Sequence, residues 1–165
     1  MEGSESEKIK IVKVFDLKDS EYFNKAVNFL QEQAGFSQEN AANRSKEMLF
    51  LVLDENDIVI GSCSGYPIYV EELMGTFIYY RSFISPKNRH EGISIKLFKE
   101  VREYFNSNRI YGPVELKGIY IIFENEILNN INDYITKNGL ILIGFTKEKK
   151  QIRVSYFNNS KFDKK

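Results

Sequence analysis

The stretch FIYYRSFISPKNRHEGISIKLFKEVREYF, Phe77 to Phe105, predicts a strand, a tight loop and an amphipathic helix. The strand reaches Ser85, and the helix begins at Ile95 after a loop that contains Gly92. The first N–H groups of a helix have no partner inside it, and the helix dipole adds about half a positive charge there. A strand that leads through such a loop into a helix is therefore a common means of binding phosphate. Gly92 permits close approach of a ligand, and Arg89 supplies a cation.

Length and composition limit the classes of protein. With 165 residues we expect one domain, at residues 9–157, between a flexible tail at 1–8 and a polar C-terminal tail at 158–165. The single cysteine, Cys63, excludes an internal disulfide and a multi-cysteine zinc site, and we expect no metal. The 23 basic and 23 acidic residues cancel, which argues against nucleic acid as the main ligand.

The sequence gives no sign of export or of membrane insertion. The first residues, MEGSESEK, are acidic and polar, unlike a secretory signal. No run approaches the roughly 20 apolar residues that cross a bilayer. We expect a cytoplasmic protein that is a monomer or a homodimer.

Hydrophobic periodicity gives the remaining elements. Runs rich in β-branched residues predict strands, and apolar residues at a period of 3.6 predict helices. The expected strands are Ile9–Asp16, Met48–Leu53, Ile58–Tyr69, Phe77–Ser85, Gly118–Glu124, Leu140–Phe145 and Gln151–Phe157. The first expected helix follows a cap at Asp19 or Ser20 and runs to Gln33, and the second follows a cap at Ser37 and runs to Lys46. The other two expected helices are Ile95–Phe105 and Glu126–Asn138.

The six residues from Arg89 to Ser94, RHEGIS, resemble the acetyl-CoA pyrophosphate loop of the GNAT N-acetyltransferase superfamily, [R/Q]xxGx[G/A]. Arg89 and Gly92 match this pattern, whereas Ser94 stands where the family has Gly or Ala. The order of elements, β-α-α-β-β-β-α-β-α-β-β, is also that of the family, so the resemblance covers nearly the whole chain. It implies an α+β (mixed α/β) fold with a strongly twisted mixed sheet of about seven strands. The sheet would be splayed between strands 4 and 5, with helices on both faces.

The resemblance implies that acetyl-CoA is the co-substrate and binds where the sheet splays. The end of the fourth strand would pair its main chain with the pantetheine arm, because the splay leaves backbone groups for a strand-like ligand. His90 is the only histidine, and we expect it beside phosphate and not in catalysis. Asn125 resembles a family asparagine that contacts the cofactor. The candidate cofactor-binding residues are Phe83, Ile84, Ser85, Arg89, His90, Glu91, Gly92, Ile93, Ser94 and Asn125.

Two residues are candidates for catalysis. Glu124, at the end of the fifth strand, is the best-placed base for the acceptor amine, and Glu71 and Glu72 are alternatives. The family proton donor to the thiolate is a tyrosine in the last helix, in a pattern like YxKxGF. That position falls on Ile135 here, and Tyr134 is displaced by one residue, about 100° around a helix. Tyr134 is therefore either the acid or a packing residue.

Three functions follow from the resemblance. The first is an N-acetyltransferase that moves an acetyl group from acetyl-CoA to a small-molecule or peptide amine by direct attack on the thioester. The second is a binding module for acyl-CoA or a protein, with little or no turnover, which the departures at Ser94 and Ile135 favour. The third is an acetylating toxin that acts on aminoacyl-tRNA, against which the balanced charge argues. Tyr79 and Tyr80 are adjacent in a strand and point to opposite faces, so we expect one in the core and one at the acceptor cleft.

Overall fold

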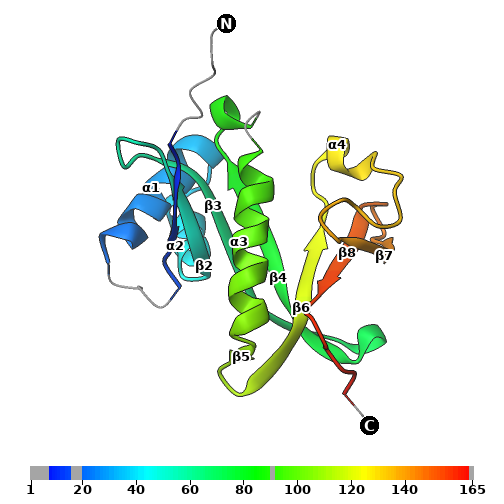
Figure 1. Ribbon diagram of the computed structural model, residues 1–165. Coiled ribbons are helices and arrows are strands. Elements are labelled where there is room, and N and C mark those ends of the chain that lie inside the picture. Colours follow the sequence, from blue (N-terminus) through cyan, green and yellow to red (C-terminus); the bar gives the residue numbers. More distant parts are fainter. Residues whose placement is uncertain (1–7, 16–19, 90–91, 164–165) are drawn as a thin grey trace, which may run out of the picture. The chain divides into compact units, whose positions relative to one another are not determined.

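The computed structural model describes residues 8–15, 20–89 and 92–163. Figure 1 shows the elements along the chain. The strands are β1 (Lys10–Lys13), β2 (Met48–Leu53), β3 (Val59–Val70), β4 (Gly75–Ile84), β5 (Ile110–Tyr111), β6 (Val114–Ile122), β7 (Ile141–Phe145) and β8 (Gln151–Tyr156). The helices are α1 (Glu21–Ala34), α2 (Gln38–Ser45), α3 (Ile93–Ser107) and α4 (Glu126–Asn129), with 3₁₀ turns η1 (Glu71–Leu73) and η2 (Pro86–Asn88). No helix among the described residues is both long and apolar enough to cross a membrane.

The strands form one eight-stranded mixed sheet in the order β1-β2-β3-β4-β6-β8-β7, and β5 pairs with β6 outside this path. The pair β4–β6 is parallel, and β6 pairs antiparallel with β8. This confirms the predicted α+β fold with a mixed sheet. The sheet has one strand more than the expected number because the two residues of β5, which the sequence placed in a loop, pair with Glu115 and Val114.

The chain divides into two compact units, and the boundaries fall inside β3, β4 and α3. The first unit comprises Met1–Ser64 and Ser82–Leu97, and the second comprises Gly65–Arg81 and Phe98–Lys165.

The core of the first unit lies between α1, α2 and the sheet. The side chains of α1 and α2 that face β2 are buried because they recur at helical spacing, while alternate residues of β2 face them. Phe83 of β4 joins this core, where its ring meets Phe29 of α1 edge-to-face at 5.8 Å. The fully packed members are Val14, Ala26, Phe29, Leu30, Ala41, Met48, Leu51 and Leu53. The first turn of α2 is capped by the Ser37 hydroxyl, which accepts from the Asn40 N–H at 3.3 Å.

In the second unit, β4 separates two sets of aromatic side chains. Tyr80 is 4% exposed and packs edge-to-face on Phe98 of α3 at 5.7 Å. Tyr79 points to the opposite face, where its ring lies 5.5 Å from Tyr66 of β3 and 6.0 Å from Tyr120 of β6. The prediction that one of the two adjacent tyrosines packs in the core is confirmed, and Tyr80 is that residue.

The helix predicted at Glu126–Asn138 is wrong beyond Asn129, where α4 ends. The following carbonyls of Ile131 and Asp133 accept hydrogen bonds from the Arg153 guanidinium of β8, at 3.3 and 2.7 Å. A helix would require those carbonyls to point along its axis to later N–H groups. The segment is therefore a loop, and Ile135 makes an isolated antiparallel bridge with Ile141.

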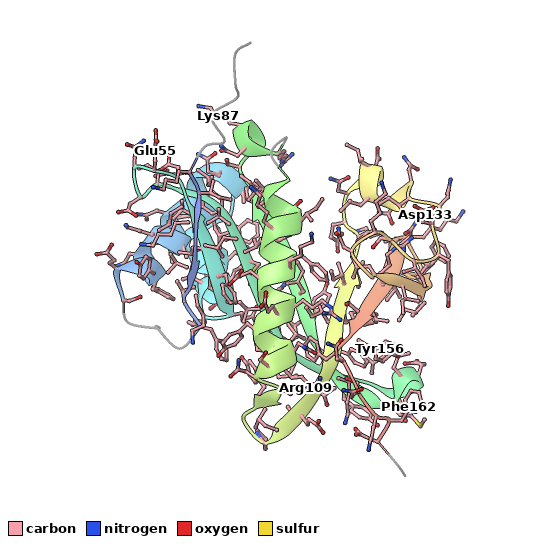
Figure 2. The ribbon with its side chains drawn as sticks, in the orientation of Figure 1. Glu55, Lys87, Arg109, Asp133, Tyr156 and Phe162 are labelled. Carbon is pink, nitrogen blue, oxygen red and sulfur yellow. The ribbon has the colours of Figure 1, made fainter. Side chains whose placement is uncertain are left out.

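The polar residues after β8 make contacts within the second unit. The Ser160 hydroxyl donates to the Lys117 carbonyl at 2.7 Å, and the Asp163 carboxylate lies 3.1 Å from the Lys117 ammonium. The Asp163 N–H donates to the Met74 carbonyl at 2.9 Å. Phe162, between these contacts, stays exposed (Figure 2). These bonds attach the described end of the chain to β6 and to the turn before β4.

The close approach of β6 to β8 predicts a strict requirement for glycine at position 118. A Cβ on Gly118 would lie 2.3 Å from the Ser155 carbonyl oxygen and 2.9 Å from the Tyr156 Cα, and both are backbone atoms that cannot rotate away. We expect Gly118→Ala to lower the free energy of unfolding by about 2 kcal/mol or more, as overpacking does. Urea denaturation measures this. Gly144→Ala in β7 is the control, because a Cβ there meets nothing within 4 Å. Equal stability of the two variants would contradict the close packing of β6 on β8.

Candidate functional site

The first unit carries the end of β4 and the loop that follows it. The Ser85 N–H donates to the Ile60 carbonyl of β3 at 2.9 Å. Backbone groups of successive strand residues point to alternate edges, so Ile84 directs its own groups away from β3. There the Ile84 carbonyl accepts a hydrogen bond from Arg89 Nε at 3.2 Å. Of the three residues predicted to pair with pantetheine, Ile84 therefore has its backbone groups on the edge of β4 opposite β3, whereas the Ser85 N–H is used by β3.

Arg89 folds back on this strand end. Its guanidinium lies 5.6 Å from the centre of the Phe83 ring, and Phe83 in turn packs into the α1 core. The hydrogen bond to Ile84 uses one of the five N–H groups of the guanidinium. The residue as a whole is exposed. Arg89 is thus an exposed cation whose guanidinium is held at the end of β4 by the Ile84 carbonyl and the Phe83 ring.

Gly92 leads the chain into α3 with φ of +65°, in the left-handed region that side chains disfavour. A Cβ built there meets no described atom within 4 Å, its chain neighbours aside. Its carbonyl accepts from the Ile95 and Lys96 N–H groups at 3.1 Å, which closes the first turn of α3. Ile93 is buried and anchors the helix, while Ser94 is exposed. The other two loop candidates, His90 and Glu91, lie outside the described residues.

This arrangement suits an anion such as a pyrophosphate. The N-terminus of a 15-residue helix offers N–H groups and a partial positive charge, and a glycine without Cβ lies directly before it. Arg89 adds a full charge three residues earlier. In the part of the chain that the structure describes, no group of three or more His, Cys, Asp or Glu side chains could hold a metal ion.

The second unit carries Glu124 and Asn125 directly after β6. The Glu124 carboxylate is exposed and forms an ion pair with the Lys150 ammonium. This hydrogen bond raises the pKa of Lys150, against the opposing effect of burial. Asn125 is the N-cap of α4, and its Oδ1 accepts from the N–H groups of Ile127 and Leu128 at 2.7 and 3.2 Å. The side chain predicted to contact the cofactor therefore caps a helix.

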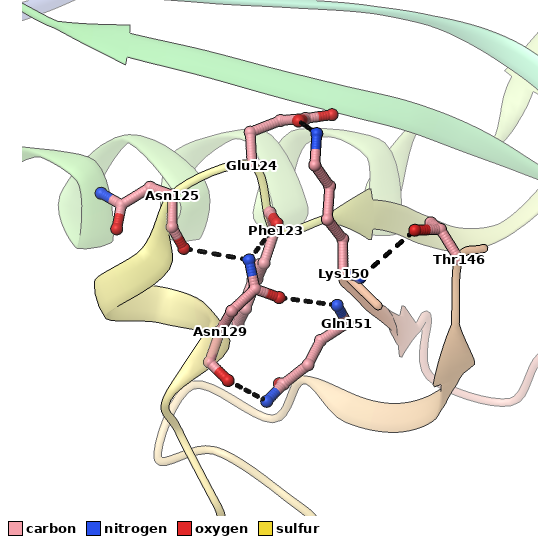
Figure 3. Close-up of polar contacts among 7 residues, drawn as sticks. All are labelled: Phe123, Glu124, Asn125, Asn129, Thr146, Lys150 and Gln151. Atoms are coloured by element: carbon pink, nitrogen blue, oxygen red, sulfur yellow. Dashed lines mark hydrogen bonds and ion pairs between the residues drawn. The ribbon is translucent and has the colours of Figure 1, made fainter. Parts of the chain in front are cut away.

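Figure 3 shows how this corner is joined to β8. The Asn129 amide donates to the carbonyls of Phe123 and Asn125, at 2.5 and 3.0 Å. Asn129 Oδ1 accepts from the Gln151 N–H at 2.7 Å, and the Gln151 side chain donates to the Asn129 carbonyl at 2.9 Å. The end of β6, α4 and the start of β8 are therefore one hydrogen-bonded structure, and Glu124 lies at its edge.

Tyr134 lies in the loop after α4 and is 65% exposed. Its carbonyl accepts from Arg153 Nη1 at 3.3 Å and from the Leu142 N–H at 2.9 Å. The predicted position of Tyr134 on a helix face is wrong because no helix forms there. The expected rotation of about 100° between Tyr134 and Ile135 therefore does not apply. The backbone of Tyr134 is held, and its ring points outward.

Tyrosines cover another part of the second unit. Tyr66, Tyr79 and Tyr120 share one face of the sheet, and the Arg81 guanidinium lies 5.1 and 5.4 Å from the ring centres of Tyr66 and Tyr79. Burial raises the pKa of Tyr120, and Tyr79 and Glu72 raise it further. Glu72, one of the two alternative bases, thus acts electrostatically on this aromatic face.

The structure brings the predicted residues together in two sets. One set, in the first unit, holds Phe83, Ile84, Ser85, Arg89, Gly92, Ile93 and Ser94. The other, in the second unit, holds Glu124, Asn125 and Tyr134. Sequence reasoning missed Asn129, Gln151 and Arg153, which organise the second set. The polar residues Gln151, Arg153 and Ser155 alternate along the strand in the sequence, but such a pattern ordinarily indicates a strand face exposed to solvent.

Comparisons with known proteins identify the fold. No family model and no curated protein matches the sequence. A GNAT-family acetyltransferase from Streptococcus pneumoniae matches with a TM-score of 0.62 and 13% identity, over 92% of this chain and 100% of that one. The ribosomal-protein-S18-alanine N-acetyltransferase from Escherichia coli matches with a TM-score of 0.61 and 10% identity, over 93% of this chain and 97% of that one. The GNAT-family N-acetyltransferase YhbS from Escherichia coli, in complex with CoA, matches with a TM-score of 0.59 and 14% identity, over 96% of this chain and 86% of that one.

The chain therefore has the fold of the GNAT-family acetyltransferases along nearly its whole length. The resemblance of the loop at Arg89 and the order of elements agree with this result. At these identities the likeness shows the fold.

The backbone at Gly92 gives a direct test of the predicted pyrophosphate loop. We expect Gly92→Val to weaken CoA binding at least tenfold, since a branched Cβ would enter the space over the first turn of α3 and would also strain a residue at φ +65°. Isothermal titration with CoA measures the affinity. Gly112→Val is the control, because Gly112 has φ of +58° and equally open surroundings but precedes no helix. Equal loss of affinity in both variants would assign the effect to strain alone.

Proposed function

We propose that this protein is an N-acetyltransferase that transfers an acetyl group from acetyl-CoA to an amine by direct attack. The observation that carries the proposal is the left-handed glycine at the start of α3, with the Arg89 cation before it. The GNAT fold over almost the whole chain supports it, as does the presence of CoA in one solved structure of that fold. The acceptor is a small-molecule amine or a peptide amine.

The first unit would bind the co-substrate. We expect the N–H groups of the first turn of α3 and the Arg89 guanidinium to hold the pyrophosphate, with Gly92 giving the close approach. The edge of β4 opposite β3 would pair with the pantetheine arm at Ile84, in the manner of an added strand. For that pairing the Arg89 side chain must release the Ile84 carbonyl, so binding at the phosphates and binding along the strand would be linked.

Glu124 and Tyr134 would supply the proton transfers. Acetyl-CoA provides an activated acetyl group as a thioester when it is bound. The attacking amine must lose a proton as its nitrogen bonds the acetyl carbon, and Glu124 would accept that proton directly or through water. As the carbon–sulfur bond breaks, the Tyr134 hydroxyl would donate a proton to the sulfur. Glu124 forms an ion pair with Lys150, so this contact would have to open as the carboxylate accepts the proton.

One experiment tests the function. The protein is incubated with acetyl-CoA and a panel comprising spermidine, N-α-acetyl-lysine, kanamycin and a peptide that begins with alanine, and the free thiol is followed with time. The alanine peptide is included because one protein of the same fold modifies an alanine of a ribosomal protein. Amine-dependent thiol release supports the transferase. CoA binding without release, across a panel extended to cell metabolites, supports the binding module instead.

The binding module remains the second candidate because of a specific observation. The family proton donor is on the last helix, and in this chain that helix ends at Asn129, before both Tyr134 and Ile135. A site that has lost its acid can still hold the cofactor. The thiol assay and a separate measurement of CoA affinity distinguish these two functions.

Removal of one hydroxyl tests the acid. We expect Tyr134→Phe to lower kcat by about 10²-fold or more, as loss of a positioned acid does, while CoA affinity is unchanged. Stopped-flow thiol release and calorimetry measure the two quantities. Tyr69→Phe is the control, since Tyr69 is also exposed, at 57%, on β3. Full activity of Tyr134→Phe would return Tyr134 to a surface role and leave the sulfur to be protonated by water.

A further inference from the structure

Arg153 of β8 is the largest fully buried side chain among the described residues, with no exposed surface. All five N–H groups of its guanidinium are used. Nε donates to the Gln151 side-chain oxygen at 2.8 Å. Nη1 donates to the carbonyls of Tyr134 and Leu140 at 3.3 and 3.1 Å, and Nη2 to those of Ile131 and Asp133 at 3.3 and 2.7 Å.

The four backbone acceptors belong to one segment, residues 131–140, which we name the arginine loop. Its chain passes around the guanidinium, so that carbonyls from both of its ends meet one side chain. Asp133, labelled in Figure 2, lies in this loop, and its carbonyl makes the shortest of the four bonds. Inside the loop, the Leu140 N–H donates to the Thr136 hydroxyl at 3.1 Å.

The charge of Arg153 is balanced by these oxygens and by an aromatic ring. All five acceptors are carbonyl or amide oxygens, and none is a carboxylate. The guanidinium also lies 5.5 Å from the centre of the Phe123 ring. Burial lowers the pKa of Arg153, which Asp133 partly offsets. A buried cation needs its partners, and the loop carbonyls need their donors, so each holds the other in place.

Tyr134 is one of the loop residues whose carbonyl Arg153 holds. Because the residue is 65% exposed, packing contributes little to its position. Its carbonyl oxygen accepts hydrogen bonds from both Arg153 and the Leu142 N–H of β7. The arginine loop therefore sets the position of the Tyr134 backbone, and with it the point from which the side chain and its hydroxyl extend.

We propose that Arg153 is a positioning residue for catalysis, which holds the arginine loop so that Tyr134 presents its hydroxyl to the reaction. This inference rests on the proposed function and on the acid role of Tyr134. It adds that an arginine outside the reacting atoms controls the acid, through the backbone and without contact to the tyrosine ring. Gln151 assists, since its side chain donates to the carbonyls of Asn129 and Ile131 at 2.9 and 2.8 Å.

The test compares Arg153→Lys with a matched arginine in the same unit. Lysine keeps the charge but has three donors on one atom, and it cannot span carbonyls from both ends of the loop. Arg102→Lys is the control, because Arg102 of α3 also donates to β8, at Ser155 and at the Tyr156 carbonyl, both at 2.9 Å, but not to the loop. Thr136→Val is a second variant on the half-buried surface of the loop, and it removes only the bond to Leu140.

We expect Arg153→Lys to lower kcat on the order of 10²-fold, the effect of a small misplacement, with CoA affinity unchanged. In a double-mutant cycle, the same change made in Tyr134→Phe should cost less than about threefold, since the acid it positions is already absent. Thr136→Val should lower kcat several-fold, and Arg102→Lys should not. Amide hydrogen exchange of residues 131–142 should accelerate in Arg153→Lys and Thr136→Val but not in the control.

The outcomes separate the inference from the proposed function. If the wild-type protein releases no thiol, the proposed function is overturned. If Tyr134→Phe is fully active, the acid role of Tyr134 is overturned. Either result also overturns the inference about Arg153. An Arg153→Lys effect that is equally large in both backgrounds overturns the inference alone. So does unchanged hydrogen exchange of the loop in a folded Arg153→Lys protein. If Arg153→Lys does not fold, the same cycle with Thr136→Val gives the decision.

Discussion

A buried guanidinium organises the C-terminal part of this protein. Arg153 has no exposed surface, and each of its five N–H groups meets an oxygen of the same structural unit. Hydrogen bonds to a charged group contribute about 1.5–3 kcal/mol each when made, and an unpaired buried charge is far costlier. The loop and the arginine are therefore stable only together. This requirement ends α4 after four residues and replaces the predicted helix with a chain whose carbonyls point inward.

The same corner shows how polar side chains join elements in a sheet protein. Exposed Asn125, half-buried Asn129 and buried Gln151 each make two or more hydrogen bonds, and together they join β6, α4 and β8. Satisfied networks of this kind favour one conformation, because each alternative leaves a buried polar group without a partner. Glu124 and Tyr134 lie on the surface of this network, so rigid support lies directly beneath the two side chains proposed for proton transfer.

The proposed phosphate-binding part of the site consists of three local features. A glycine at φ +65°, the N-terminus of α3 and one arginine packed on Phe83 provide it. These parts are local in sequence, from Phe83 to Ser94, and each has a recognisable residue type. Because these parts are local, the sequence alone could suggest the loop as a phosphate-binding candidate, and that role stays a prediction.

The sequence by itself determined the order of the main elements and the apolar strands such as Met48–Leu53, because these depend on spacing and on local backbone preference. Only the tertiary structure decided which tyrosine of the pair Tyr79 and Tyr80 is buried, where α4 ends, and what Arg153 does. The reason is physical. The partners of Arg153 are mostly backbone carbonyls, which every residue carries and no sequence pattern reveals, and only the folded chain brings four of them to one guanidinium.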